Sequence, residues 1–216
     1  MRLRRLSAVG AAAAGLAMIA APALADAPYT VSYDGSTSGD HSVTATAKGD
    51  TTLSANGIDL ICSSSTVGAT VHAGTYASSP AAVATIDSAS WSGCSMAGFP
   101  ATVSVTSPSW SLNLVDPNSQ TSALTDTLGG SITNINNVAV DVNLGLAHCT
   151  FTVSGSVTSG QFLEDNGKGG QEIDVNASPG LTIASPSAGC LGLVSDGTPA
   201  TFDGQYNLDG QHINVS

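Results

Sequence analysis

VAVDVNLGL, the stretch at residues 138–146, alternates between larger apolar residues and small or polar ones over its whole length. Successive side chains of an extended chain point to opposite sides, so a period of two is typical of a β-strand that buries one face. The side predicted to be buried comprises Val138, Val140, Val142, Leu144 and Leu146. This stretch therefore predicts a strand with an aliphatic inner side and a polar outer side.

The same alternation returns in YTVSY at residues 29–33, WSLNL at 110–114 and ATFDGQYNL at 200–208. Turn-forming Asp-Gly and Gly-Gly pairs separate such runs, at residues 34–35, 129–130, 196–197 and 209–210. No sustained helical period follows residue 25. The sequence thus predicts an all-β fold of roughly ten to fourteen antiparallel strands.

Two parts of the chain resemble each other. CSSSTVGATVHAGTY at residues 62–76 resembles CTFTVSGSVTSGQF at 149–162, and SWSGC at 90–94 resembles PSAGC at 186–190. A Pro-Ala-Thr triplet follows each second cysteine. Matched blocks in one order predict two similar halves, residues 26–115 and 124–216, joined by DPNSQTSA at 116–123. The short join favours halves packed together in one antiparallel β-sandwich or barrel, although two separate domains stay open.

Four cysteines, Cys62, Cys94, Cys149 and Cys190, suggest two disulfides in an exported protein. Three connectivities are possible, and the repeat favours Cys62–Cys94 and Cys149–Cys190, one bridge in each half. A metal site is the alternative, but no pair has the C-x-x-C spacing that zinc sites favour.

The N-terminus carries Arg2, Arg4 and Arg5, then an Ala-rich apolar run and small residues before Asp26. This pattern predicts a secretory signal peptide over residues 1–25 and an extracellular protein. No second apolar run is long enough to span a membrane. After cleavage, two lysines face 16 carboxylates, a net charge of −14. That balance argues against nucleic acid and anionic membrane surfaces as partners.

The signal peptide, the low basic content and the paired "C…TV…G" and "SGC…PAT" blocks resemble the small secreted, Ala/Gly/Ser/Thr/Val-rich β-proteins of high-GC Gram-positive bacteria. Many members of that group have no assigned activity. The resemblance implies a secreted β-protein and no particular chemistry.

The most distinctive acidic segment is EDNGKGGQEID at residues 164–174. Glu172 and Asp174 would share one face of a strand, and EIDV resembles the start of the catalytic strand of laminarinase-like glycosidases. That resemblance would make Glu172 the nucleophile and Asp174 its supporting carboxylate. The position of the family's acid/base glutamate holds Asn176 or Ala177 instead.

Calcium is a second possibility for this segment, because Glu164, Asp165, Asn166, Glu172 and Asp174 offer hard oxygen ligands near flexible glycines. The EF-hand spacing is absent, and an ordinary acidic hairpin is the alternative. Trp91, three residues before Cys94, is expected to pack against a disulfide, with sugar stacking as its alternative, and Trp110 is expected in the core.

Three functions remain open. The favoured one is a secreted, non-catalytic β-protein that binds or coats an extracellular ligand or surface, without a cofactor. The second is an extracellular polysaccharide hydrolase that uses Glu172 and Asp174. The third is a secreted inhibitor or toxin-like effector.

Overall fold

The computed structural model of the protein describes residues 28–106, 108–116, 126–165, 167–210 and 212–216. The predicted signal peptide, residues 117–123 of the predicted join and the candidate calcium ligand Asn166 lie outside these ranges. The described residues form twelve strands and one short 3₁₀ helix: β1 (Tyr29–Tyr33), β2 (Gly39–Ala47), β3 (Thr51–Ala55), β4 (Ile58–Tyr76), β5 (Ala81–Met96), β6 (Phe99–Val105), β7 (Trp110–Asp116), β8 (Thr127–Asn143), β9 (His148–Leu163), β10 (Gln171–Ala184), η1 (Ala188–Cys190), β11 (Pro199–Leu208) and β12 (Ile213–Val215).

The antiparallel pairings close into a ring, so the all-β prediction is confirmed and takes the form of a barrel. Passing round it, β4 pairs β5, β5 pairs β6 and β7, and both of these pair β8. The ring continues through β9, β10 and β11, which returns to β4 by way of β2 and β3. Because β2 and β3 share one place and β6 and β7 share another, the ring has eight strand positions.

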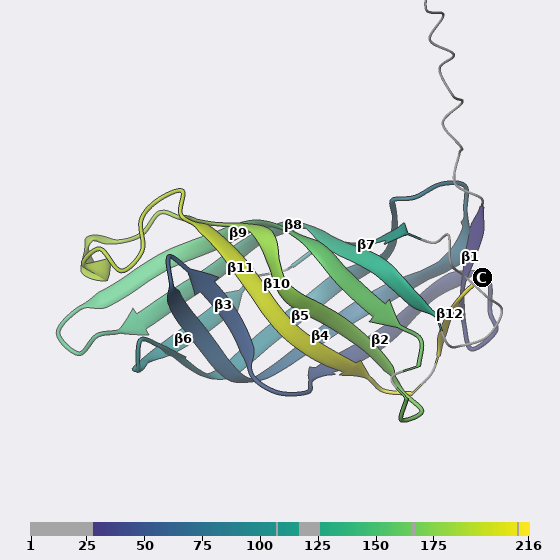
Figure 1. Cartoon of the computed structure of the whole chain (residues 1–216), viewed down its shortest axis with the longest axis horizontal. Helices are drawn as coiled ribbons and strands as arrows, with labels where there is room; N and C mark the ends of the chain where they lie inside the picture. Colours follow the sequence, from purple (N-terminus) through teal and green to yellow (C-terminus); the bar gives the residue numbers. More distant parts are fainter. Residues whose placement is uncertain (1–27, 107, 117–125, 166, 211) are drawn as a thin grey trace, which may run out of the picture.

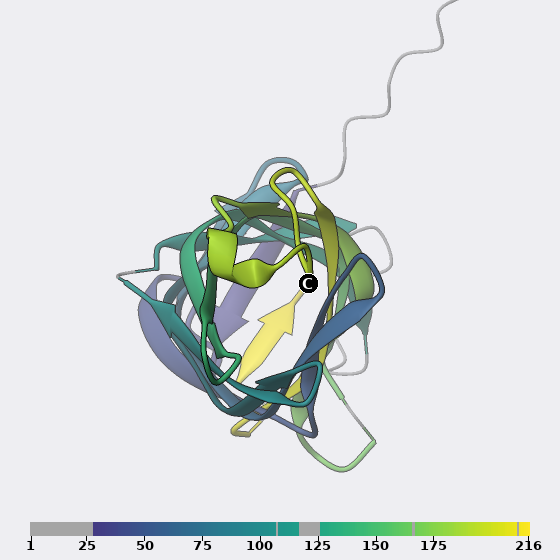
Figure 2. The same cartoon turned by 90° about the vertical axis from the view of Figure 1, so that its left-hand side faces the viewer.

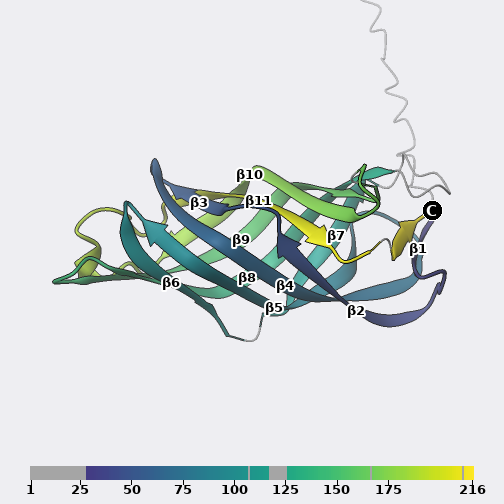
Figure 3. The same cartoon turned by 90° about the horizontal axis from the view of Figure 1, so that it is seen from below.

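The barrel is elongated, and its long strands run obliquely along it (Figure 1). Figure 3, seen from below, shows β4, β5 and β6 crossing the long axis in the same oblique way. Strand tilt of this kind is what closure of a sheet requires. Barrels with eight strands have an interior that side chains fill or that holds one small ligand.

Strand alternation separates the two faces of this barrel. Along β9, Phe151, Val153 and Val157 are buried, whereas Thr150 is exposed. The predicted inner face of residues 200–208 is confirmed, because Ala200, Gly204, Tyr206 and Leu208 are buried and Phe202 packs on the core. Along these strands the sheet therefore encloses mainly apolar side chains.

Two of the sequence predictions about elements are wrong. Gly129-Gly130 forms no turn but lies within β8, where Gly130 pairs with Leu114 and Gly160. Leu146 does not continue the buried face, because β8 ends at Asn143 and Leu146 is fully exposed in the turn to β9. Alternation alone did not show where the chain turns back.

Two glycines allow the barrel wall to bend. A register shift separates Asp174 from Leu181 in the β9–β10 pairing. Gly155 and Gly180 face each other there, both with positive φ, and a Cβ on either would clash with backbone oxygen of the facing strand. Such bulges increase local twist and let a long sheet coil.

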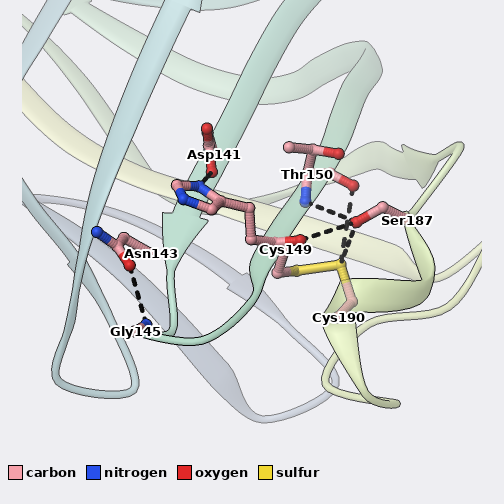
Figure 4. Close-up of polar contacts among 8 residues, drawn as sticks. Asp141, Asn143, Gly145, Cys149, Thr150, Ser187 and Cys190 are labelled. Atoms are coloured by element: carbon pink, nitrogen blue, oxygen red, sulfur yellow. Dashed lines mark hydrogen bonds and ion pairs between the residues drawn. A yellow bond between two sulfur atoms is a disulfide. The ribbon is translucent and has the colours of Figure 1, made fainter.

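Both predicted disulfides are present and lie toward the η1 end of the barrel. Cys62–Cys94 joins directly paired residues of β4 and β5, and Cys149–Cys190 ties η1 to the start of β9. Figure 4 shows Ser187 beside the second bridge. Its Oγ accepts a hydrogen bond from Thr150 N at 3.0 Å and donates to His148 O at 3.2 Å.

The division into halves 26–115 and 124–216 stays a prediction. The strands of the two ranges pair with each other on both sides of the ring, through β6 and β7 with β8 and through β2 and β3 with β11. Within the described residues, no helix has the length and apolar character needed to cross a membrane.

Replacing Cys149 and Cys190 together by alanine is expected to lower the free energy of unfolding by about 3–4 kcal/mol, because the bridge closes a long loop of the unfolded chain. Denaturant unfolding of the wild type and the double variant measures this. The Cys62→Ala/Cys94→Ala variant is the matched comparison and should lose a similar amount. Loss of less than about 1 kcal/mol in both variants would contradict the stabilising role of the bridges.

Candidate ligand-binding cavity

The barrel encloses an apolar cavity of about 190 Å³. Its wall draws on all the strands of the ring, among them Val71 of β4, Val140 of β8 and Val175 of β10. No aspartate, glutamate, lysine, arginine or histidine of the described chain lines it. Apolar cavities of this kind stay dry and take up apolar molecules, and a cavity of about 150 Å³ is already large enough for benzene.

The two ends of the lumen are closed differently. Toward η1, two disulfides and packed side chains such as Met96, Val142 and Ile183 fill the barrel. At the other end, β1 and β12 pair with each other and form a ribbon attached to the end of β4. Looking along the barrel, Figure 2 shows this end ribbon lying within the outline of the ring.

The inner side of the end ribbon is part of the cavity wall. Val31 of β1 and both Ile213 and Val215 of β12 line the lumen and are buried. In β1, Val31 is followed by Ser32 in the period-two pattern that the sequence showed at residues 29–33. In β12, Asn214 lies between Ile213 and Val215 in the same way. The end ribbon therefore acts as the cap on this end of the cavity.

Two buried polar side chains hold the edge of β12 that β1 does not pair. Gln171 Oε1 accepts hydrogen bonds from His212 N at 3.2 Å and Ile213 N at 3.1 Å, and its Nε2 donates to Ile213 O. Glu164 Oε1 accepts from Val215 N at 2.6 Å. Gln171 thus pairs with β12 as a neighbouring strand would, which satisfies backbone groups that burial would otherwise leave unpaired.

Burial also changes the acidity of Glu164. Its side chain is fully buried, and desolvation raises the pKa of its carboxyl to about 6, with nearby Asp126 adding to the rise. Hydrogen bonds from Val215 N and Asp126 N act in the opposite direction. Desolvation, which penalises the charged carboxylate, outweighs these two hydrogen bonds, so the pKa of Glu164 is raised.

The four predicted acidic residues do not converge on one site. Glu164 belongs to the cap, and Asp165 Oδ1 accepts a hydrogen bond from Gly167 N at 2.7 Å in the following loop. Glu172 and Asp174 do share one face of β10, as predicted, but it is the outer one, because Ile173 between them lines the cavity.

Each of the last two carboxylates has a partner of its own. Glu172 is paired with Lys48 at 3.0 Å, and Asp174 accepts a hydrogen bond from Gln205 at 3.4 Å. Among the described residues, no group of three or more His, Cys, Asp or Glu side chains is placed to hold a metal ion. The hypotheses of a hydrolytic pair and of a calcium site on this segment stay predictions.

Sequence reasoning missed most of the polar groups inside the lumen. Ser65 and Tyr206 are buried and share a hydrogen bond of 2.9 Å, and Trp91 also hydrogen-bonds Tyr206. Burial raises the pKa of Tyr206, and these two hydrogen bonds oppose the rise. Trp91 packs against the larger core cluster and also lines the cavity, and its expected contact with a disulfide stays a prediction.

Two further polar side chains line the cavity without a partner. Thr51 Oγ1 and Trp110 Nε1 are buried and make no hydrogen bond in the described structure. Trp110 was expected in the core and is there. Thr51 could have been found from TTLSA at residues 51–55, because the alternation with Leu53 and Ala55 places it on the inner face.

Comparison with protein families, with curated proteins and with solved structures gives no match for this chain. The candidate site is therefore defined by its own geometry.

Glu164 is expected to titrate with a midpoint near pH 6. A raised pKa means that the folded protein binds this proton more readily than the unfolded chain does. The contribution of Glu164 to stability is thus complete below about pH 4.5 and is lost as the pH rises through about 6. A ¹³C NMR titration of the glutamate δ-carbons measures the midpoint. The chain has only two glutamates, and Glu172→Gln assigns the signals. A midpoint at or below 4.5 would contradict the burial argument.

Proposed function

We propose that this protein is a secreted, non-catalytic binding protein that holds a small, uncharged, apolar molecule inside its barrel. The observation that carries the proposal is the barrel lumen, which has an apolar wall and a cavity of about 190 Å³. Ordinary protein cores are packed with few voids larger than a water molecule. A cavity of this size is thus a feature that needs an explanation, and small-molecule sites are typically concave, mostly apolar and few per protein.

The distribution of charge supports an uncharged ligand. The described acidic and basic side chains lie outside the cavity wall, and those near its cap, such as Glu164, are engaged with backbone. A charged group moved into this lumen would lose its hydration without gaining a counter-charge, which costs several kcal/mol or more. Apolar surface, in contrast, gains about 25 cal/mol per Å² when it leaves water.

Export fits the same role. The two disulfides are bonds that persist in oxidising compartments, and residues 1–25 have the pattern of a signal peptide. An apolar molecule is poorly soluble in the medium outside a cell, so a protein with a polar outer face and an apolar lumen would keep it dispersed. The polysaccharide-hydrolase and inhibitor alternatives remain hypotheses without a specific observation that favours them.

Ethylbenzene, a neutral hydrocarbon of suitable size, is expected to bind mature protein with a Kd on the order of 0.1 mM. This corresponds to a net binding free energy of about 0.7 kcal/mol for each of its carbon atoms, within the range seen for small ligands. Ala69 of β4 lines the cavity, and Ala69→Phe adds a ring to the lumen. This variant should weaken binding at least tenfold. Chemical-shift titration of the protein amides measures both constants.

Ser64→Phe, at an exposed position of the same strand, is the matched control and should bind like the wild type. Circular dichroism checks that both variants fold. Absence of ethylbenzene binding to the wild type, or equal binding by Ala69→Phe, would refute the proposed lumen site.

A further inference from the structure

The unpartnered polar groups of the lumen carry information about the ligand. Thr51 is 1% exposed and Trp110 is 5% exposed, and both line the cavity. A buried donor without a partner costs roughly 1–3 kcal/mol, and most native buried donors are satisfied. Two such groups in one cavity therefore point to a partner that enters from outside the chain.

The two groups lie at different places on the cavity wall, because Thr51 pairs with Cys62 of β4, whereas Trp110 pairs with Ile86, whose partner is Ala69 of β4. The strands β11, β3, β4, β5 and β7 follow one another round the ring. They contribute the polar side chains Tyr206, Thr51, Ser65, Trp91 and Trp110, in that order. We call these five strands the polar wall. The strands β8 to β10 line the cavity mostly with aliphatic side chains such as Val140, Val153 and Val175, together with Ser131 and Gln161.

The polar wall contains both polar side chains that are hydrogen-bonded to each other and polar side chains that are not. Ser65, Tyr206 and Trp91 satisfy one another through hydrogen bonds. The hydroxyl of Thr51 and the indole N–H of Trp110 have no such arrangement. The same wall thus holds three polar side chains that complete each other and two that are left over.

We infer that the ligand, on the basis of the proposed lumen site, is a mostly hydrocarbon molecule with an uncharged oxygen acceptor, such as a ketone or ester, that accepts a hydrogen bond from Trp110 Nε1 or from Thr51 Oγ1. An indole N–H can only donate, so its partner must be an acceptor. A carboxylate is excluded because no cationic side chain of the described residues lines the cavity. The hydrocarbon part lies against the strands β8 to β10, and the oxygen faces the polar wall.

Three related probes, ethylbenzene, acetophenone and benzoate, test this inference. Acetophenone has the carbon skeleton of ethylbenzene and adds one ketone oxygen, and benzoate replaces the methyl ketone by a carboxylate. Their Kd values are measured by amide chemical-shift titration on mature wild-type protein and on Thr51→Val, Trp110→Phe and the double variant. Thr52→Val, the same change at the next position of β3, is the control, because alternation turns Thr52 away from Thr51.

In the double variant, the ratio of the acetophenone Kd to the ethylbenzene Kd is expected to be about tenfold higher than in the wild type. Thr52→Val should keep the wild-type ratio, and benzoate should bind at least a hundredfold more weakly than acetophenone. Thr51→Val is nearly isosteric, so its unfolding midpoint should stay equal or rise, because it removes an unpaired hydroxyl.

The inference is overturned if ethylbenzene binds while the ratio of the acetophenone Kd to the ethylbenzene Kd is the same in the double variant as in the wild type. A benzoate Kd as low as that of acetophenone would also overturn it. A clear drop in stability of Thr51→Val would also contradict it, since that result would mean the hydroxyl already has a structural partner. Failure of both ethylbenzene and acetophenone to bind the wild type would instead refute the lumen site itself.

Discussion

Antiparallel pairing all the way round the ring is the constraint on which the other features of this protein depend. Because β11 returns to β4 through β2 and β3, the barrel wall has no long unpaired edge, and every strand presents one face to the lumen and one to the outside. The lumen must then be filled or left open by the inward residues alone. Valine, leucine and isoleucine dominate those positions, and they leave a cavity of about 190 Å³.

Such a cavity has an energetic cost, and the ends of the barrel compensate for it. By the measured dependence of stability on cavity volume, an empty space of this size costs about 4–5 kcal/mol compared with a filled core. The two disulfides near η1 contribute roughly 3–4 kcal/mol each in the chain-entropy model. At the other end, Gln171 and Glu164 hold β12 over the lumen by hydrogen bonds to its backbone. Stability is thus concentrated at the two ends, and the space between them is free for a ligand.

Local sequence patterns predicted the strands and faces well, and long-range closure poorly. The alternation at 200–208 and at 110–114 placed Tyr206, Leu208, Trp110 and Leu114 inside correctly, because the period of two is a local property. The repeat gave the disulfide pairing. In contrast, nothing local tells Gly129-Gly130 from a turn or shows that β8 ends at Asn143. The role of Glu164 was hidden for the same reason, since its partner Val215 lies 51 residues further along the chain. The polar wall combines five strands and exists only once the ring closes.

We propose that the lumen is an apolar binding cavity rather than a fully packed core. A crystal structure determined under xenon pressure tests this most directly, because xenon enters dry apolar cavities without needing any polar contact. We expect xenon density inside the barrel, in contact with Val140, Val157 and Val175, and no movement of the strands. A lumen that excludes xenon, because side chains have collapsed into it or ordered water fills it, would contradict the proposed apolar binding cavity.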